Sequence, residues 1–215
     1  MIKAVIFDMN GVITDTEPIH ELAMQEVLKK RGFTLTTEDY TRFCPGRNDE
    51  DGLRDILKHN NLTNLDLVEL VKEKVQLYSK LAKNVHEVEG ALNLIKELSK
   101  KVKLGVATSA LRDDAEIELE QLKIRQFFHA IVSSDDVSMG KPDPEPYLLA
   151  ATKLSESPEN CLVIEDAKAG IAAAKAAGMK CIALKSKYTS DEDLLQADKI
   201  VSSLAEIKVS DLNSI

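Results

Sequence analysis

The stretch Lys3-Ala-Val-Ile-Phe-Asp8-Met-Asn10-Gly11-Val12 decides the fold of this chain. The run from Lys3 to Phe7 is short, mainly apolar and rich in β-branched residues, which predicts a strand buried on both faces of a parallel sheet. Asp8 follows at the carboxyl edge of that strand, where ligands bind in open α/β sheets. Gly11 permits the tight turn by which the chain leaves the sheet. The stretch predicts either a reactive carboxylate or an aspartate that only begins a turn.

From Gly90 onward, short apolar runs alternate with helical patterns. We expect strands over residues 103–108, 130–133, 161–164, 180–184 and 199–201, and helices over 91–100, 113–123, 145–154 and 168–177. Such alternation predicts a Rossmann-like α/β core, in which helices cover both faces of a parallel sheet.

Residues 16–82 have a different pattern, with helical periodicity and no strand signal. Helices are expected over 17–31 and 49–59, another beginning near Thr36, and a longer one capped by Asn64. This segment stands between the first strand and the rest of the sheet. We therefore expect a core of residues 1–15 and 83–215, with an all-helical cap domain of residues 16–82 inserted at the edge that carries Asp8.

Polar residues stand where four of the predicted strands end. They are Asp8, Thr108-Ser109-Ala110, Gly140-Lys141-Pro142 and Glu165-Asp166. Each has an ordinary interpretation as a helix cap or a solvated loop charge. A parallel sheet brings all of these strand ends to one edge, so their succession favours a functional site.

The composition limits the possible partners. The chain has 215 residues and a net charge of −8, which argues against a nucleic-acid or anionic-membrane surface. It has no signal peptide and no apolar run near the length of a membrane span, so we expect a cytoplasmic protein, and a monomer.

With these residues, the sequence resembles the haloacid dehalogenase (HAD) superfamily. The resemblance covers the whole chain. Within the superfamily, the chain is most similar to the branch that holds β-phosphoglucomutase and related sugar-phosphate phosphatases. It rests on four motifs: Phe7-Asp8-Met9-Asn10-Gly11-Val12, Thr108-Ser109, Gly140-Lys141-Pro142-Asp143-Pro144 and Glu165-Asp166-Ala-Lys-Ala-Gly170. These motifs are specific for the superfamily and its fold, and much less specific for the substrate.

The resemblance implies that Asp8 is a nucleophile that forms an aspartyl phosphate. An anionic carboxylate that attacks an anionic phosphate needs a cation between them, and Mg²⁺ suits oxygen ligands. By resemblance its ligands are Asp8, the backbone carbonyl of Asn10, and Asp166, with Glu165 close by or also ligating.

The resemblance also implies a phosphate-binding set. Thr108 would hydrogen-bond the transferring phosphoryl group, together with the backbone N–H groups of Ser109 and Ala110. Lys141 would neutralise a phosphoryl oxygen and orient Asp8.

Asn10 departs from the family pattern. Family phosphatases and mutases carry an aspartate here, which protonates the leaving oxygen and activates the next nucleophile, whereas an amide cannot carry that proton. Loss of a general acid/base typically costs ~10²–10⁴ in rate. The chain is then a disabled variant made to trap a complex, a natural member that uses another group or water, or a member with different chemistry, since the dehalogenases also lack aspartate here. The remaining motifs favour the first two.

The cap is expected to choose the substrate. Thr16 and His20 match hinge positions of the mutase branch, although His20 could equally be a half-buried helix residue. Arg47 lies in a turn that resembles the substrate-specificity loop. The mutase has a lysine and an arginine near here, where an ungapped alignment puts Pro45 and Asp49, so the sequence favours a phosphatase that binds one phosphate over a mutase that binds two.

The sequence thus predicts a Mg²⁺-dependent phosphatase-type enzyme that acts on a small phosphorylated metabolite, expected to be a sugar phosphate. One alternative is β-phosphoglucomutase, an isomerase. The other is a non-catalytic protein that binds a phosphometabolite and has lost its acid/base.

Overall fold

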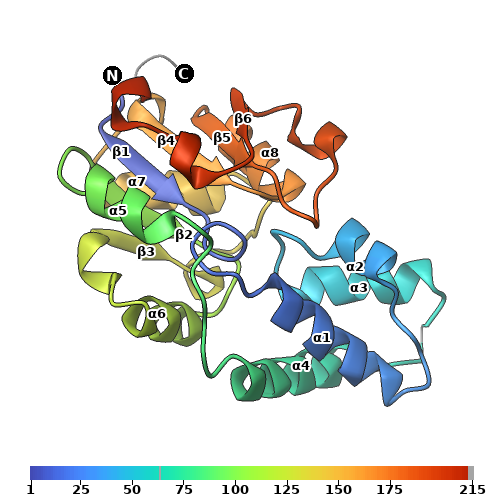
Figure 1. Cartoon of the computed structure of the whole chain (residues 1–215). Helices are drawn as coiled ribbons and strands as arrows, with labels where there is room; N and C mark the ends of the chain where they lie inside the picture. Colours follow the sequence, from blue (N-terminus) through green and yellow to red (C-terminus); the bar gives the residue numbers. More distant parts are fainter. Residues whose placement is uncertain (63, 213–215) are drawn as a thin grey trace.

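The predicted parallel sheet is present in the computed structural model, which describes residues 1–62 and 64–212. Within these residues the sheet has six strands in the order β3-β2-β1-β4-β5-β6, and every neighbouring pair is parallel (Figure 1). The strands are β1 (Ala4–Phe7), β2 (Lys103–Ala107), β3 (Ala130–Val132), β4 (Cys161–Glu165), β5 (Lys180–Leu184) and β6 (Lys199–Val201). β1 is one of the two central strands, as its apolar run predicts, and all four of its residues are buried.

Helices cover both faces of the sheet. Helices α5 (Ala91–Leu98) and α6 (Arg112–Gln121) share one apolar core with alternate residues of the strands. Helices α7 (Glu145–Leu154) and α8 (Lys168–Ala176) share the core on the opposite face. This two-sided burial explains the nearly continuous apolar runs of the strands. In the described part of the chain, no helix combines the length and the apolar character needed to cross a bilayer.

Four helices follow β1 and form a separate apolar cluster, at the lower right of Figure 1. They are α1 (Glu17–Lys29), α2 (Thr37–Phe43), α3 (Asp49–His59) and α4 (Leu67–Leu81), and we call them the cap. The prediction that Asn64 caps the last helix is wrong. Asp66 is the cap, because its carboxylate accepts hydrogen bonds from two backbone N–H groups, at 2.9 and 3.1 Å.

The cap contacts the core beside the carboxyl edge of the sheet. Ser109, after β2, donates a hydrogen bond from Oγ to the backbone oxygen of Gly46 in the cap, at 3.0 Å. Tyr188, after β5, packs in the apolar cluster of the cap, where its ring lies 5.9 Å from that of Tyr40. The cap and the sheet edge therefore face each other, while the domain boundaries at residues 16 and 82 stay a prediction.

Candidate active site

The register of the central strands brings two acidic residues to one level. Phe7 pairs with Val106 on one side and with Ile164 on the other. Asp8 therefore lies level with Glu165, the last residue of β4, and its backbone N–H donates to the oxygen of Ile164 at 2.9 Å. The sheet thus assembles at its carboxyl edge groups that are far apart in the sequence.

Lys141 joins these two carboxylates. Its Nζ lies 2.5 Å from Oδ1 of Asp8 and 2.8 Å from Oε1 of Glu165. The hydroxyl of Tyr147, from α7, donates to the same oxygen of Glu165 at 2.9 Å. Lys141 is only 2 % exposed, so this ammonium can exist there only because carboxylates and hydrogen bonds replace its water. Tyr147 is a member of this site that the sequence did not indicate.

The carboxylates at this edge fit a divalent cation. Asp8, Glu165 and Asp166 are all buried, and each offers an oxygen within 4.8 Å of the others. Gly11 has a φ of +85°, and a Cβ atom there would lie 2.2 Å from Oδ2 of Asp166. A glycine is therefore required at that turn both for its backbone and to leave room for the carboxylate. Oxygen donors are the ligands that Mg²⁺ prefers.

The electrostatics of the site also favour a further positive charge. Burial raises the pKa of Asp8, and the nearby Glu165 raises it further, while Lys141 opposes both effects. Burial likewise raises the pKa of Asp166 well above its usual range, with Glu165 and Asp8 adding to the effect. Lys141 has a raised pKa because Asp8 and Glu165 outweigh its burial. One ammonium thus leaves the three carboxylates incompletely neutralised.

The loop after β2 brings Thr108 to the same edge. Its buried hydroxyl accepts a hydrogen bond from the backbone N–H of Ala110 at 3.1 Å and donates to Oδ1 of Asn10 at 3.4 Å. Thr108, Asn10 and Asp8 all line one cavity, together with Ser109 and Ala110. The predicted phosphate-binding residues are therefore close together, although the side chain of Ser109 is directed to the cap.

Asn10 connects the sheet edge to the hinge of the cap. Its Nδ2 donates to Oγ1 of the buried Thr16 at 2.6 Å and lies 3.5 Å from Nε2 of His20. Both hinge residues expected from the sequence are thus beside Asn10. Asn10 itself lines the cavity.

Lys74 is a second buried lysine in the site, and the sequence did not indicate it. Its Nζ lies 2.6 Å from Nδ1 of His20 and 2.6 Å from Oδ1 of Asp49. Burial and the charge of Lys74 hold the pKa of His20 well below its usual range, so the imidazole is neutral. A signal was available, since Leu70, Lys74 and Tyr78 follow one another at four-residue spacing on the buried stripe of α4.

Arg47, the predicted specificity residue, lines the cavity but is bound to the cap. Its Nη1 donates to the backbone oxygen of Phe43 at 3.1 Å and to Oδ2 of Asp55 at 2.8 Å. The cavity encloses about 970 Å³ between cap and sheet edge. This volume is within the range typical of small-molecule sites.

A buried hydrogen bond joins cap and core beside the cavity. The hydroxyl of Tyr78 in α4, whose ring stacks on His20 at 4.0 Å, donates to Oε1 of Glu118 in α6 at 2.5 Å. Within the described residues, Oε2 of Glu118 has no hydrogen-bond partner. Burial raises the pKa of this carboxyl to about 7, although the Tyr78 hydroxyl favours its charged form.

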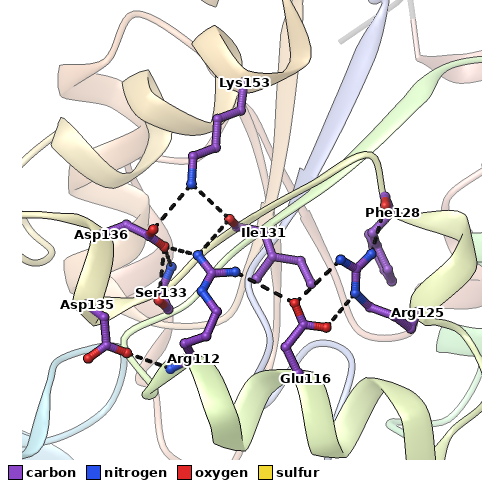
Figure 2. Close-up of polar contacts among 9 residues, drawn as sticks. All are labelled: Arg112, Glu116, Arg125, Phe128, Ile131, Ser133, Asp135, Asp136 and Lys153. Atoms are coloured by element: carbon purple, nitrogen blue, oxygen red, sulfur yellow. Dashed lines mark hydrogen bonds and ion pairs between the residues drawn. The ribbon is translucent and has the colours of Figure 1, made fainter.

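A polar network fixes the start of the loop that carries Lys141 (Figure 2). Asp136 accepts hydrogen bonds from the backbone N–H and the hydroxyl of Ser133, at 2.8 and 2.9 Å, and it pairs with Arg112 and Lys153. Both cations also donate to the backbone oxygen of Ile131. Partial burial opposes ionisation of Asp136, but these contacts lower its pKa to about 2. The turn is therefore held by three elements before the chain reaches the site.

The sequence matches a family model and several named proteins. The model described as "Haloacid dehalogenase-like hydrolase" matches residues 5–184. The "Phosphorylated carbohydrates phosphatase" of Thermotoga maritima is 38% identical over 185 residues, which cover 84% of this chain and 83% of that protein. The "Beta-phosphoglucomutase" of Bacillus subtilis is 34% identical over 213 residues, or 95% of this chain and 91% of the relative.

A solved structure agrees with the fold. The β-phosphoglucomutase from Clostridium difficile superposes with a TM-score of 0.89 at 29% identity, and the match covers all of this chain and 96% of the other. This chain thus has the fold of the HAD proteins, as the resemblance implied. The chain belongs to the haloacid dehalogenase-like hydrolases.

Proposed function

We propose that this protein is a Mg²⁺-dependent, phosphatase-type enzyme that transfers the phosphoryl group of a small sugar phosphate through an aspartyl phosphate on Asp8. One observation carries the proposal: the Asp8 carboxylate lies 2.5 Å from the Lys141 ammonium, beside Asp166, in the lining of a cavity. A nucleophile, a cation and a metal-binding carboxylate at one point are what phosphoryl transfer needs.

In the first step, an oxygen of Asp8 forms a bond to phosphorus as the P–O bond to the sugar breaks, and the leaving oxygen takes a proton. In the second step, water attacks phosphorus, loses a proton, and the Asp8–phosphorus bond breaks to release inorganic phosphate. Lys141 balances phosphoryl charge and orients Asp8. Thr108 and the backbone N–H groups of Ser109 and Ala110 hold the phosphoryl oxygens.

Asp8, Asp166 and the backbone carbonyl of Asn10 would hold Mg²⁺, with Glu165 close by. When bound, Mg²⁺ supplies the positive charge that lets an anionic carboxylate approach an anionic phosphate. The raised pKa values of Asp8 and Asp166 support this assignment, because added positive charge would stabilise both carboxylates in their charged forms.

Asn10 is expected to weaken catalysis. Both steps need a group that moves a proton, and an amide cannot be that group. The side chain can still donate hydrogen bonds, as it does to Thr16, so ligand binding should survive. The proposed enzyme therefore works slowly, with water or another group moving the proton.

The substrate class comes from the relatives. One is named as a phosphatase of phosphorylated carbohydrates and another as a β-phosphoglucomutase, which supports a sugar phosphate and keeps a mutase as second candidate. A mutase would depend on a bisphosphate activator and retain phosphate in its product. The monomeric state and the cytoplasmic location remain predictions from the sequence.

The test is a turnover screen of phosphorylated sugars with this chain and with Asn10→Asp, in Mg²⁺ or in excess chelator. We expect Asn10→Asp to release phosphate roughly 10²-fold faster, because it restores ordinary general acid/base catalysis. Chelator should abolish release by both proteins. A rate that is unchanged or lower in Asn10→Asp would mean that Asn10 works in a different mechanism. Tight binding without turnover by either protein would instead favour a non-catalytic binding protein.

A further inference from the structure

The cavity carries an unusual charge balance for a site that binds phosphates. The part of its lining that belongs to the cap and to α6 contributes five carboxylates, which are Glu17, Asp49, Glu50, Asp51 and Asp114. Two of them, Glu50 and Asp51, pair with the exposed Arg54, which does not line the cavity. Among the described residues that line it, the cap contributes two permanent cations, Arg47 and Lys74. We call this lining the cap-side wall.

Both cations of the cap-side wall already have anionic partners. Arg47 lies 2.8 Å from Asp55. Lys74 is 1 % exposed and lies 2.6 Å from Asp49, whose side chain is 27 % exposed. The third cation of the cavity, Lys141, is bound to Asp8 and Glu165. A phosphate on the cap-side wall would therefore find no cation that is not already paired.

The geometry points to Asp49 as the residue that selects substrates by their charge. Because Asp49 pairs with Lys74, the cap-side wall rejects a second phosphate. It accepts a monophosphate whose other end is neutral or cationic. This inference rests on the proposed function, because it takes the transferred phosphate to bind at Asp8. Asp49 achieves this in two ways, by neutralising Lys74 and by leaving part of its own carboxylate open to the cavity.

The neighbours of Lys74 strengthen this reasoning. Nδ1 of His20 lies 2.6 Å from Nζ of Lys74, so the imidazole is a second hydrogen-bond partner of this ammonium. A sugar bisphosphate has to place one phosphate at Asp8 whichever way round it enters. Its other phosphate then meets the carboxylates of the cap-side wall, where both cations are already paired, and such a contact between like charges is unfavourable.

The test uses three esters with one scaffold and one common phosphate. Glucosamine 6-phosphate, glucose 6-phosphate and glucose 1,6-bisphosphate differ in having a cationic, a neutral or an anionic group away from that phosphate. Dissociation constants in Mg²⁺ are measured by calorimetry, and initial phosphate release in parallel. We expect the bisphosphate to bind the parent chain about tenfold more weakly than either monophosphate. In Asp49→Asn the ratio of these dissociation constants should fall about tenfold, so that the bisphosphate and the monophosphates bind about equally.

Glu26→Gln is the matched control, because it removes one carboxylate from an exposed cap position outside the cavity and should leave the preference unchanged. An equal or stronger affinity of the parent for the bisphosphate would overturn the inference, as would an unchanged ratio in Asp49→Asn. If no ester is hydrolysed even by Asn10→Asp, the proposed function fails, but the ratio of dissociation constants still tests the role of Asp49. Binding of none of the esters would overturn both.

Discussion

Two buried lysines, one at the sheet edge and one in the cap, show how differently the two regions of the cavity are built. Lys141 and Lys74 are each 1 % exposed by side chain. Lys141 binds two carboxylates that are themselves buried, whereas Lys74 binds one partly exposed carboxylate and a neutral imidazole. The sheet edge is thus a closed cluster of charges, and the cap is a more open wall. We expect substitutions at the edge to affect chemistry and stability strongly, and substitutions in the cap to affect mainly substrate choice.

The largest expected effect is that of Asp8→Ala, which removes the nucleophile at the edge. Turnover of any phosphate ester should fall by roughly 10⁴-fold or more. In the parent chain, an added phosphoryl group should be detectable by intact-protein mass spectrometry after incubation with acetyl phosphate, because Asn10 slows hydrolysis of the intermediate. The same measurement on Asp8→Ala should show no such mass. Phosphorylation of Asp8→Ala, or turnover at the parent rate, would mean that another residue is the nucleophile.

The next effect compares the two lysines directly. Lys141→Met leaves two fully buried carboxylates without their cation, and such a loss costs about 3–5 kcal/mol in free energy of unfolding. Lys74→Met leaves Asp49, which still reaches solvent, so its cost should be about 1–2 kcal/mol. Urea unfolding at neutral pH, without added metal, measures both. Equal destabilisation by the two substitutions would contradict the contrast between a closed edge and an open wall.

The sequence was sufficient to predict the sheet edge for a physical reason. A parallel sheet places the residues after each strand at one level, so Asp8, Thr108 and Glu165 could be brought together from strand boundaries alone. Lys141 lies further along the loop after β3, and its place at this edge rested on the family motif. The alternation of apolar runs and helices likewise predicted the strands to within one or two residues. The chemical roles of these residues stay a prediction, because proximity does not show reactivity.

The cap could not be predicted to the same depth. Its contacts depend on how helices pack, and sequence periodicity gives only the face that each helix buries. Lys74 looked like one of many charged helix residues, although it lies between Leu70 and Tyr78 on the buried stripe. Arg47 was predicted to be a substrate residue of the cap, but its partner Asp55 lies in α3 and could not be inferred. A lysine at a buried helical position is the signal to examine in such sequences.

The hydrogen bond between Tyr78 and Glu118 joins the cap to the core. Its contribution to stability can be tested through its pH dependence. The pKa of Glu118 is about 7 in the folded protein, against an ordinary value of 4.5. Between pH 4.5 and pH 7 the folded protein therefore keeps a proton that the unfolded chain has lost. Its contribution to stability is therefore greatest below about pH 4.5 and is lost as the pH rises to 7. Glu118→Gln cannot lose that proton. Relative to the parent, it should gain about 1–3 kcal/mol in free energy of unfolding between pH 5 and pH 8.

The control for this joint is Tyr78→Phe, which removes the hydroxyl that favours charged Glu118. It should make the stability of the protein fall more steeply between pH 5 and pH 8 than in the parent, because the carboxylate loses its donor. If Glu118→Gln and the parent show the same pH dependence, Glu118 is ionised in the folded state throughout this range. The hydrogen bond between cap and core would then be made to a charged carboxylate and not to a protonated carboxyl group.

The smallest expected effect is that of Arg47→Ala, in the cap. Arg47 lines the cavity, but it is held by Asp55 and the Phe43 carbonyl, so it can help to orient a sugar without acting on the phosphorus atom. We expect KM for the best sugar phosphate to rise about tenfold while kcat changes little, since such a loss removes binding common to ground and transition states. The rate with p-nitrophenyl phosphate, which has no sugar to orient, should change much less. Asp55→Asn should reproduce the KM effect in weaker form, because it frees the guanidinium without removing it. Equal losses on both substrates would move Arg47 into the chemistry of the edge or into folding, and would remove the distinction between the two regions.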